Sequence, residues 1–179
     1  MGDESDFTLL QRYRNGDPAA FRELVLRYQR PVYNAAYWVL HNAEDARDVA
    51  QTVFLRVAEH ADDYDPAYKF FSWIYRIAVN EALNLHRRLE REQPLADGVE
   101  FEADGADPAQ QLEVAERAQL LREALSKMSM TDRTVLTLRH FSELSYRDIG
   151  EVLDLDEKTV KSRLFEARQR LKALLPGVH

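Results

Sequence analysis

The chain has 179 residues and a formal net charge of −7, and 45% of its residues are hydrophobic. This length and apolar content predict either one medium-sized folded domain or two small ones. Because the chain has no cysteine, disulfides, thiolate zinc sites and a cysteine nucleophile are excluded. The acidic balance opposes indiscriminate binding to nucleic acid, so any contact with DNA has to be local or assisted by a partner.

Nothing in the sequence indicates a membrane segment. No apolar run approaches the roughly 18 residues of a membrane span. The first residues, MGDESDF, lack the basic and apolar regions of a signal peptide. We therefore expect no membrane insertion and a location in the cytoplasm.

Apolar residues recur at helical spacing in three segments of the N-terminal half. These segments are Phe21–Val32, Ala46–Val57 and Phe70–Arg91. No alternating strand pattern competes with them, so the predicted fold class is all-α.

An acidic segment interrupts this pattern. Residues 92–116 contain no Lys or Arg, and two prolines and two glycines break any helix there. Helical spacing resumes at Leu112 and continues to Met128. The sequence therefore predicts two small helical domains, residues 1–91 and 112–179, joined by an acidic flexible linker of residues 92–111.

The C-terminal segment LSYRDIGEVLDLDEKTVKSRLFEARQRLK, residues 144–172, predicts two helices joined by a short turn near Asp154. Ser145 is placed to cap the first helix, and Asp148 takes the place of the Glu or Gln of a capping box. The second helix is expected to start near Asp156, with its apolar residues on one stripe. The opposite face carries Lys158, Lys161, Ser162, Phe165 and Gln169.

Two interpretations of this helix pair compete. It is either a helix-turn-helix whose second helix enters the major groove of DNA, or a helical hairpin with a solvated charged face. Solvation explains Phe165 poorly, whereas a thymine methyl group would suit it. The segment from Lys158 to Lys172 contains three Lys and three Arg but a single acidic residue. Both details favour the helix-turn-helix.

Three motifs in one order then identify a family that the chain resembles: the extracytoplasmic-function group of sigma factors, the two-domain bacterial initiation factors. The segment FRELVLRYQRPVYNAAYWVLHNAEDARDVAQTVFLRV resembles their core-binding segment, and FFSWIYRIAVNEALNLHRR resembles their promoter-melting helix. The segment LSYRDIGEVLDLDEKTVKSRLFEARQRL resembles their reader of the −35 element. The resemblance covers about Phe7 to Leu175.

The resemblance implies an alternative sigma factor in the bacterial cytoplasm. Such a protein binds core RNA polymerase, recognises −35 and −10 promoter elements and starts transcription of a specialised set of genes. It needs no cofactor and no metal, and a Ser/Thr kinase or an anti-sigma protein would control it.

One set of residues matches the family's surface for the clamp helices of the polymerase's largest subunit. Carboxylates there would pair with basic side chains of the partner, and apolar side chains would add contact area. Taken alone, Asp45 and Asp48 would equally suit a solvated helix face. The implied core-binding residues are Asp45, Asp48, Gln51, Thr52, Phe54 and Leu55.

A second set combines aromatic with basic and amide side chains. Bases pulled from a duplex need rings to stack on and polar groups that read their edges, and phosphates need cations. A place in the hydrophobic core is the alternative for some of the rings, notably Phe71 and Trp73. The residues expected at −10 DNA are Tyr64, Tyr68, Lys69, Phe70, Trp73, Arg76, Asn80, Arg87 and Arg88.

A third set matches the face of the family's −35 reader. It consists of Lys158, Thr159, Lys161, Ser162, Arg163, Phe165 and Glu166. Glu166 departs from the basic residue that is frequent in the family. A carboxylate can accept a hydrogen bond from cytosine N4, so the −35 sequence is expected to differ from that of relatives with Arg.

The core-binding segment departs from the family as well. In DARDVAQT, residues 45–52, Arg47 and Thr52 stand where two carboxylates are common. Phosphorylation of Thr52 would add about −1.5 to −2 charges and so restore the negative charge that the motif lacks. Thr52 is therefore a candidate phosphosite that switches on polymerase binding, unless it is a tolerated substitution compensated elsewhere.

Other classes of function fit less well. The chain has no Walker loop, GxSxG or HExxH motif, and its five histidines are scattered, so no enzyme is expected. The acids Asp62, Asp63 and Asp65 could attract a metal, although a solvated loop is the simpler reading. A stand-alone helix-turn-helix regulator is the main alternative, and a protein-only interaction module is another. Neither explains the features of the N-terminal half.

Overall fold

The computed structural model describes residues 4–92 and 108–175, except for the side chains of residues 92 and 108–115. Within these ranges the chain forms eight α-helices and one short 3-10 helix and has no strand, which confirms the all-α prediction. Most helices begin at a short polar side chain that accepts a hydrogen bond from a backbone N–H of the first turn. These capping residues are Ser5, Asp17, Asn42, Ser129, Ser145 and Asp156.

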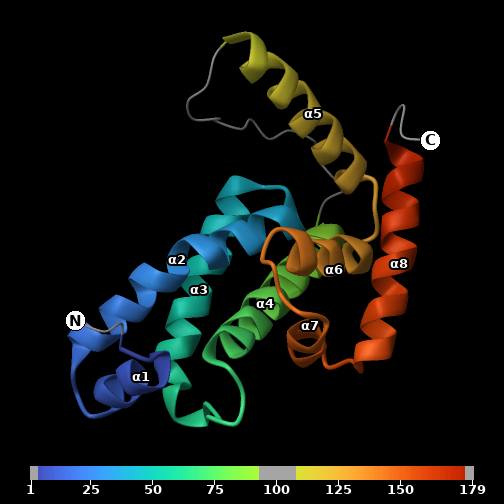
Figure 1. Cartoon of the computed structure of the whole chain (residues 1–179). Helices are drawn as coiled ribbons and strands as arrows, with labels where there is room; N and C mark the ends of the chain where they lie inside the picture. The colour runs from blue at the N-terminus through green and yellow to red at the C-terminus, as the bar shows by residue number, and fades with distance from the viewer. Residues whose placement is uncertain (1–3, 93–107, 176–179) are drawn as a thin grey trace.

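The N-terminal domain is built around three long helices (Figure 1). Its elements are α1 (Asp6–Arg14), α2 (Pro18–Leu40), α3 (Ala43–Glu59), the 3-10 helix η1 (Ala61–Asp63) and α4 (Phe70–Glu92). Helices α2, α3 and α4 pack against one another, and Leu24, Val53 and Ile74 are almost fully buried between them. This packing orients the remaining face of α4 and one face of α3 outward.

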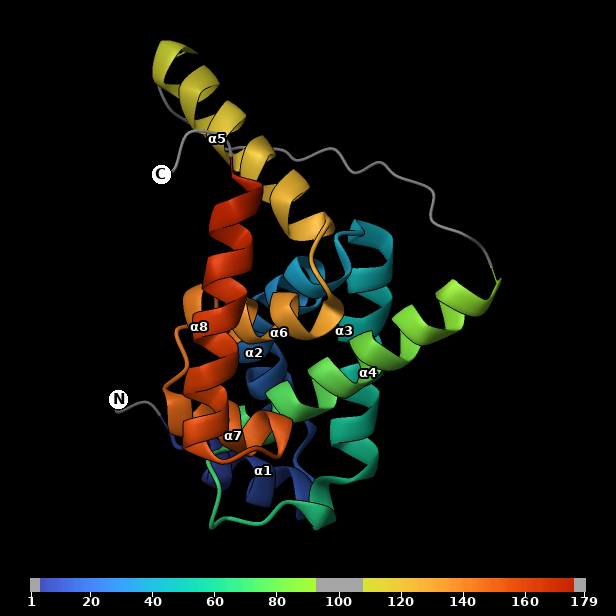
Figure 2. The same cartoon turned by 90° about the vertical axis from the view of Figure 1, so that its right-hand side faces the viewer.

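The C-terminal domain comprises α5 (Pro108–Ser126), α6 (Met130–His140), α7 (Tyr146–Leu153) and α8 (Glu157–Leu174). The inner stripe of α8, which includes Val160, Leu164 and Ala167, is buried, and α8 packs on α6 and α7. Helix α5 projects away from the other helices in both views (Figures 1 and 2).

The two domains pack against each other, with α6 on α2 and α7 on α4. Figure 2 shows α6 and α7 between α8 and the N-terminal helices. The ring of Trp38 stacks on that of Phe141, with centroids 3.9 Å apart and planes 15° apart. Arg133 donates from Nη1 to the carbonyl oxygen of Val39 over 2.9 Å, at the C-terminal end of α2. We call this contact between α2, α4 and α6, α7 the junction.

The predicted helices are confirmed, and two further helices were not anticipated. Helix α1 is short, and α6 has no apolar stripe because it is buried from residue 132 to residue 138, polar side chains included. Helix α5 begins at Pro108, inside the predicted linker of residues 92–111. Most of that linker, residues 93–107, lies outside the described residues.

Candidate nucleic-acid interface

Helices α7 and α8 form the predicted helix pair. Ser145 and Asp148 make a complete capping box: Ser145 Oγ accepts from the backbone N–H of Asp148, and the Asp148 carboxylate accepts from that of Ser145. Asp154 ends α7 in the left-handed conformation, with φ 56°. Asp156 then caps α8 by accepting from the N–H of Thr159 over 2.8 Å. Local capping therefore fixes both ends of a very short connection.

The outward face of α8 is exposed over its first half. Lys158, Lys161, Ser162, Arg163 and Phe165 are all exposed, and Phe165 exposes 63% of its surface although it is apolar. The Lys161 ammonium lies 2.9 Å from Glu157 and 5.7 Å from the centre of the Tyr146 ring. The face thus combines cations, a hydroxyl and an aromatic ring, the groups that read base edges and phosphates.

Besides Lys161, two more residues of the predicted −35 set are engaged within the chain. Thr159 donates its hydroxyl proton to Asp156 over 2.6 Å and is only partly exposed. Glu166 is exposed and pairs with Arg170 at 3.1 Å, and Arg170 also contacts Asp132 at 2.7 Å. The Glu166 carboxylate is therefore held by a cation one turn further along α8.

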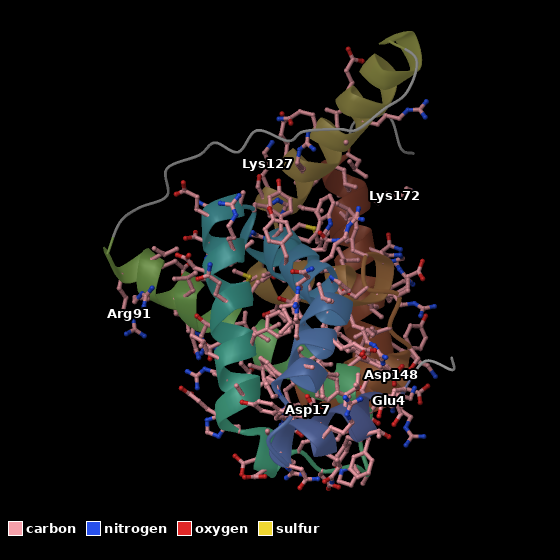
Figure 3. The ribbon with its side chains drawn as sticks, turned by 90° about the vertical axis from the view of Figure 1, so that its left-hand side faces the viewer. Glu4, Asp17, Arg91, Lys127, Asp148 and Lys172 are labelled. Atoms are coloured by element: carbon pink, nitrogen blue, oxygen red, sulfur yellow. The ribbon has the colours of Figure 1, made fainter. Side chains whose placement is uncertain are left out.

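A second exposed face runs along α4. Trp73, Arg76, Asn80 and Arg87 recur at steps that place them on one side of a helix. Trp73 is half-buried and the other three are exposed. Burial, together with the charges of Asp48 and Glu44, raises the pKa of the Asp45 carboxyl above its ordinary value, and the exposed Arg88 opposes this rise. Figure 3 shows Arg91 at the far tip of α4, across the molecule from Lys172.

The aromatic residues before and at the start of α4 divide into two groups. Tyr64 and Phe70 are 6% and 4% exposed, and their rings lie edge to face at 5.6 Å. In this conformation neither ring is free to stack on a base, which differs from the expectation for these two residues. Tyr64 instead donates its hydroxyl proton to the carbonyl oxygen of Tyr68 over 2.7 Å. Tyr68 itself is 54% exposed, so the buried rings hold the loop that presents it.

Lys69 connects this face to the other domain. Its ammonium lies 3.1 Å from the carboxylate of Asp148, the capping-box residue of α7. Burial raises the pKa of Asp148, but hydrogen bonds from Ser145 and Lys69 outweigh it and leave the pKa below its ordinary value. Sequence reasoning missed this contact because no local pattern links positions so far apart in the chain.

The predicted core-binding residues lie on α3. Asp48, Gln51 and Leu55 are exposed, and Leu55 exposes 64% of its surface. Asp45, Thr52 and Phe54 are partly buried. The hydroxyl of Thr52 donates to the backbone carbonyl of Asp48 over 2.9 Å.

Two further searches concern the described residues alone. Within residues 4–92 and 108–175, no group of three or more His, Asp or Glu side chains is arranged to hold a metal ion. In the same ranges, none of the helices combines the length and the apolar character that crossing a membrane requires.

Comparison with known protein families gives two matches along the chain. Residues 24–92 match sigma-70 region 2, and residues 118–171 match sigma-70 region 4. The first covers most of α2 and all of α3, η1 and α4, and the second covers the end of α5, all of α6 and α7, and most of α8.

Similar proteins match over nearly the whole length. The RNA polymerase sigma-H factor of Pseudomonas aeruginosa is 35% identical, over 97% of this chain and 95% of that protein. The ECF RNA polymerase sigma factor SigW of Bacillus subtilis is 31% identical, over 93% of this chain and 94% of that protein.

Two solved structures are similar as well. CnrH in complex with the cytosolic domain of CnrY has a TM-score of 0.71 and 29% identity, and covers 96% of this chain and 97% of that one. The sigma factor RpoE from Bartonella quintana, in complex with the anti-sigma factor NepR, has a TM-score of 0.69 and 26% identity, and covers 89% and 98%.

Proposed function

The chain belongs to the extracytoplasmic-function group of the sigma-70 family, the alternative sigma factors of transcription initiation, and on that premise we propose a role for each exposed face. The outer face of α3 binds core RNA polymerase. Helix α4 and the loop before it bind the −10 element, and α8 reads the −35 element. The chain acts in the bacterial cytoplasm, where its polymerase is. The observation that carries the proposal is the single exposed face of α4, which holds Trp73, Arg76, Asn80 and Arg87.

The face of α4 suits a melted strand better than an intact duplex. An indole ring offers a base a surface to stack on, an amide reads a base edge, and guanidinium groups contact phosphates. Tyr68 and Lys69 extend this face into the preceding loop. Buried Tyr64 and Phe70 support the loop from beneath instead of contacting a base.

The face of α8 suits the major groove of a duplex. Lys161, Ser162 and Phe165 lie within the first half of the helix, the part that approaches base edges in helix-turn-helix proteins. Lys158 and Arg163 are placed to contact phosphates, which position the helix without reading sequence. Glu166 is proposed to accept from cytosine, with Arg170 alongside to limit its repulsion from phosphate.

The core-binding role of α3 is testable with a matched pair of variants. Leu55 on α3 and Leu26 on α2 expose 64% and 60% of their surface, so replacing either by Ser leaves the fold intact. Leu55→Ser should weaken the affinity for core polymerase by roughly tenfold, the usual cost of an apolar interface contact. Leu26→Ser should bind as the parent does. Equal affinity for both variants and the parent would exclude this face of α3 from the interface.

We further propose that phosphorylation of Thr52 strengthens this interface. Thr52 lies one turn after Asp48 and one turn before Arg56 on α3. A phosphate there would join Asp45 and Asp48 in one acidic ridge facing a basic partner. Arg56 already pairs with Glu81 at 2.6 Å, which leaves less of its charge to neutralise the phosphate.

The Thr52 proposal needs variants that separate charge from shape. Thr52→Glu should raise the affinity for core polymerase over that of the unmodified chain, while Thr52→Val, which keeps the branched shape, should not. In cells under the inducing condition, Thr52→Ala should lose activity. Full transcriptional activity of Thr52→Ala in these cells would contradict the proposal.

The controlling partner is proposed to be either a Ser/Thr kinase or an anti-sigma protein. The similarity to RpoE, whose structure holds an anti-sigma factor, supports the anti-sigma protein. The two are distinguished by purifying the chain from uninduced cells. A chain controlled by a kinase would be unphosphorylated and without a bound protein. A chain controlled by an anti-sigma protein would carry that inhibitor.

A further inference from the structure

A chain of three charged side chains joins α6 to the proposed −35 face of α8. Arg170 of α8 donates from Nη1 to the carboxylate of Asp132 over 2.7 Å and from Nη2 to that of Glu166 over 3.1 Å. Asp132 lies in the first turn of α6, and Glu166 lies one turn before Arg170 on α8. One guanidinium therefore links a residue of α6 to a residue of the surface that is proposed to face DNA.

Asp132 is the fixed end of this chain. Its side chain is only 10% exposed, and its backbone N–H donates to Oγ of Ser129, the capping residue of α6. The hydrogen bond from Arg170 to Asp132 is the largest influence on the guanidinium and holds its pKa above the ordinary value, with Glu166 adding less. The fold of α6 therefore sets the place of Asp132, and Asp132 sets that of Arg170.

This anchor distinguishes the pair of Arg170 and Glu166 from an ordinary surface ion pair. The two side chains are 54% and 55% exposed, and exposed pairs usually order their side chains little because both keep their freedom. A guanidinium is a planar fork, so binding of Nη1 to Asp132 largely fixes the direction of Nη2. Arg170 therefore holds Oε2 of Glu166 at a defined place and leaves Oε1 to accept from a base.

Without this restraint Glu166 has a competing partner. Arg163 lies three residues earlier on α8 and is exposed, and side chains at this spacing are neighbours on a helix. A carboxylate paired with Arg163 would turn away from Arg170 and would neutralise a cation that is proposed to contact phosphate. The contact with Arg170 thus favours the arrangement that leaves both Glu166 and Arg163 to DNA.

We propose that Asp132 and Arg170 are positioning residues that set the base preference of the −35 reader by fixing the acceptor oxygen of Glu166. A fixed carboxylate accepts from the amino group of one base, cytosine in the proposed function, and disfavours a base that presents only acceptors at that place. The inference rests on the proposed function, because it requires Glu166 to face the −35 element.

A promoter library measures this preference. Core polymerase with the full chain first selects a promoter from random-sequence DNA, and each of its −35 positions is then randomised. Binding is read at each position as the ratio between the preferred base pair and the others. Arg170→Met removes the fork and keeps a good helix former. Lys172→Met is the control, because it removes an exposed cation two residues further along α8.

The position that Glu166 reads is the one at which Glu166→Ala abolishes the preference. In the parent chain this ratio should be roughly 5- to 150-fold, the usual range for one mismatch. Arg170→Met should lower it by at least roughly threefold and leave the other −35 ratios unchanged, whereas Lys172→Met should change none. If Arg170→Met instead weakens binding evenly for every sequence, Arg170 is a phosphate contact and the inference is overturned.

A double substitution shows whether Arg170 acts through Glu166. Arg170→Met added to Glu166→Ala should change no ratio beyond the effect of Glu166→Ala alone. A further change would mean that Arg170 reads a base itself, which overturns the inference and leaves the proposed −35 role of α8 intact. If the parent chain selects no −35 element, or if Glu166→Ala alters no preference, the proposed function of this face fails and the inference fails with it.

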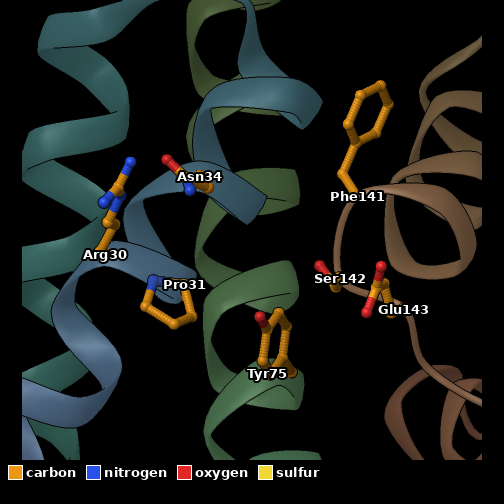
Figure 4. Close-up of a pocket in the computed structure, with 7 residues that line it drawn as sticks. All are labelled: Arg30, Pro31, Asn34, Tyr75, Phe141, Ser142 and Glu143. Carbon is orange, nitrogen blue, oxygen red and sulfur yellow. The ribbon is translucent and has the colours of Figure 1, made fainter.

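The anchor is tested from the other helix. Asp132→Asn keeps an oxygen that accepts from Nη1 of Arg170 and should retain most of the preference, whereas Asp132→Ala should reproduce the loss seen with Arg170→Met. Glu143→Gln is the control for the lost charge, because Glu143 follows α6 and lines a cleft of about 280 Å³ with Asn34 of α2 and Tyr75 of α4 (Figure 4). A folded Asp132→Ala chain with the preference of the parent would overturn the role of the anchor.

Discussion

Gly150 controls the contact between the two helices of the −35 reader. It lies inside α7, and its carbonyl oxygen accepts the N–H groups of Asp154 and Leu155 in the turn. A Cβ built on Gly150 would lie 2.5 Å from the backbone carbonyl oxygen of Leu155. The close approach of α7 to the start of α8 therefore depends on the missing side chain.

Replacing Gly150 by Ala sets two effects against each other. Helix propensity favours Ala by about 0.8–1 kcal/mol in a helix interior. The clash is with backbone, so the turn has to move by at least about half an ångström, and overpacking of this kind costs typically 1–3 kcal/mol. Because the atom in the clash is backbone and not the end of a flexible side chain, the cost lies in the upper part of this range, about 2–3 kcal/mol. We therefore expect Gly150→Ala to lower the free energy of unfolding by about 1–2 kcal/mol.

Urea unfolding of the full chain followed by circular dichroism measures this effect. Arg147→Ala is the control, because it introduces Ala on the same helix at a side chain that is 82% exposed. Hydrogen exchange should show the loss of protection in α7 and the start of α8. A Gly150→Ala chain as stable as the parent or more stable would refute the steric reasoning.

Three further predictions concern α8 and the junction. Glu166→Arg should move the preferred base at one −35 position from cytosine toward guanine in a promoter library, since Arg binds guanine edges; an unchanged preference would contradict the assignment. Phe165→Ala should weaken −35 binding by roughly three- to tenfold without changing stability, because the ring is 63% exposed. Burial lowers the pKa of His41 to about 4 from 6.5, with Arg133 and Arg122 acting in the same direction. The folded chain therefore binds this proton less readily than the unfolded chain, and stability should fall as the pH drops from about 6.5 toward 4, by up to about 1.4 kcal/mol per pH unit. His41→Asn, which suits the left-handed backbone there, should remove that slope in urea titrations.

Local signals in the sequence predicted the helix pair closely. Ser145, Asp148 and Asp156 are capping residues whose partners lie within three positions along the chain, and the structure shows each bond. Apolar spacing likewise predicted α2, α3 and α4. Helix α6 was not predicted because its polar residues Thr134 and Thr137 are buried. It therefore lacks the separate polar face by which apolar spacing identifies a helix.

Contacts between distant segments could not be predicted in this way. The sequence predicted Tyr64 and Phe70 as rings that contact −10 DNA, and only their packing against α2 and Trp73 shows that they are buried. The junction has no local signature, because Arg133 and Lys69 each find their partner in the other domain. The DNA-binding, polymerase-binding and phosphorylation roles of individual residues stay predictions.

Transcription by core polymerase with this chain as its only sigma factor tests the central claim most directly. Transcript starts would be mapped on a random-sequence DNA library, with core polymerase alone as the control. The account predicts starts at a fixed distance downstream of two shared elements, spaced as −35 and −10, that depend on the chain. Starts that are the same without the chain, or that share only one element, would contradict it.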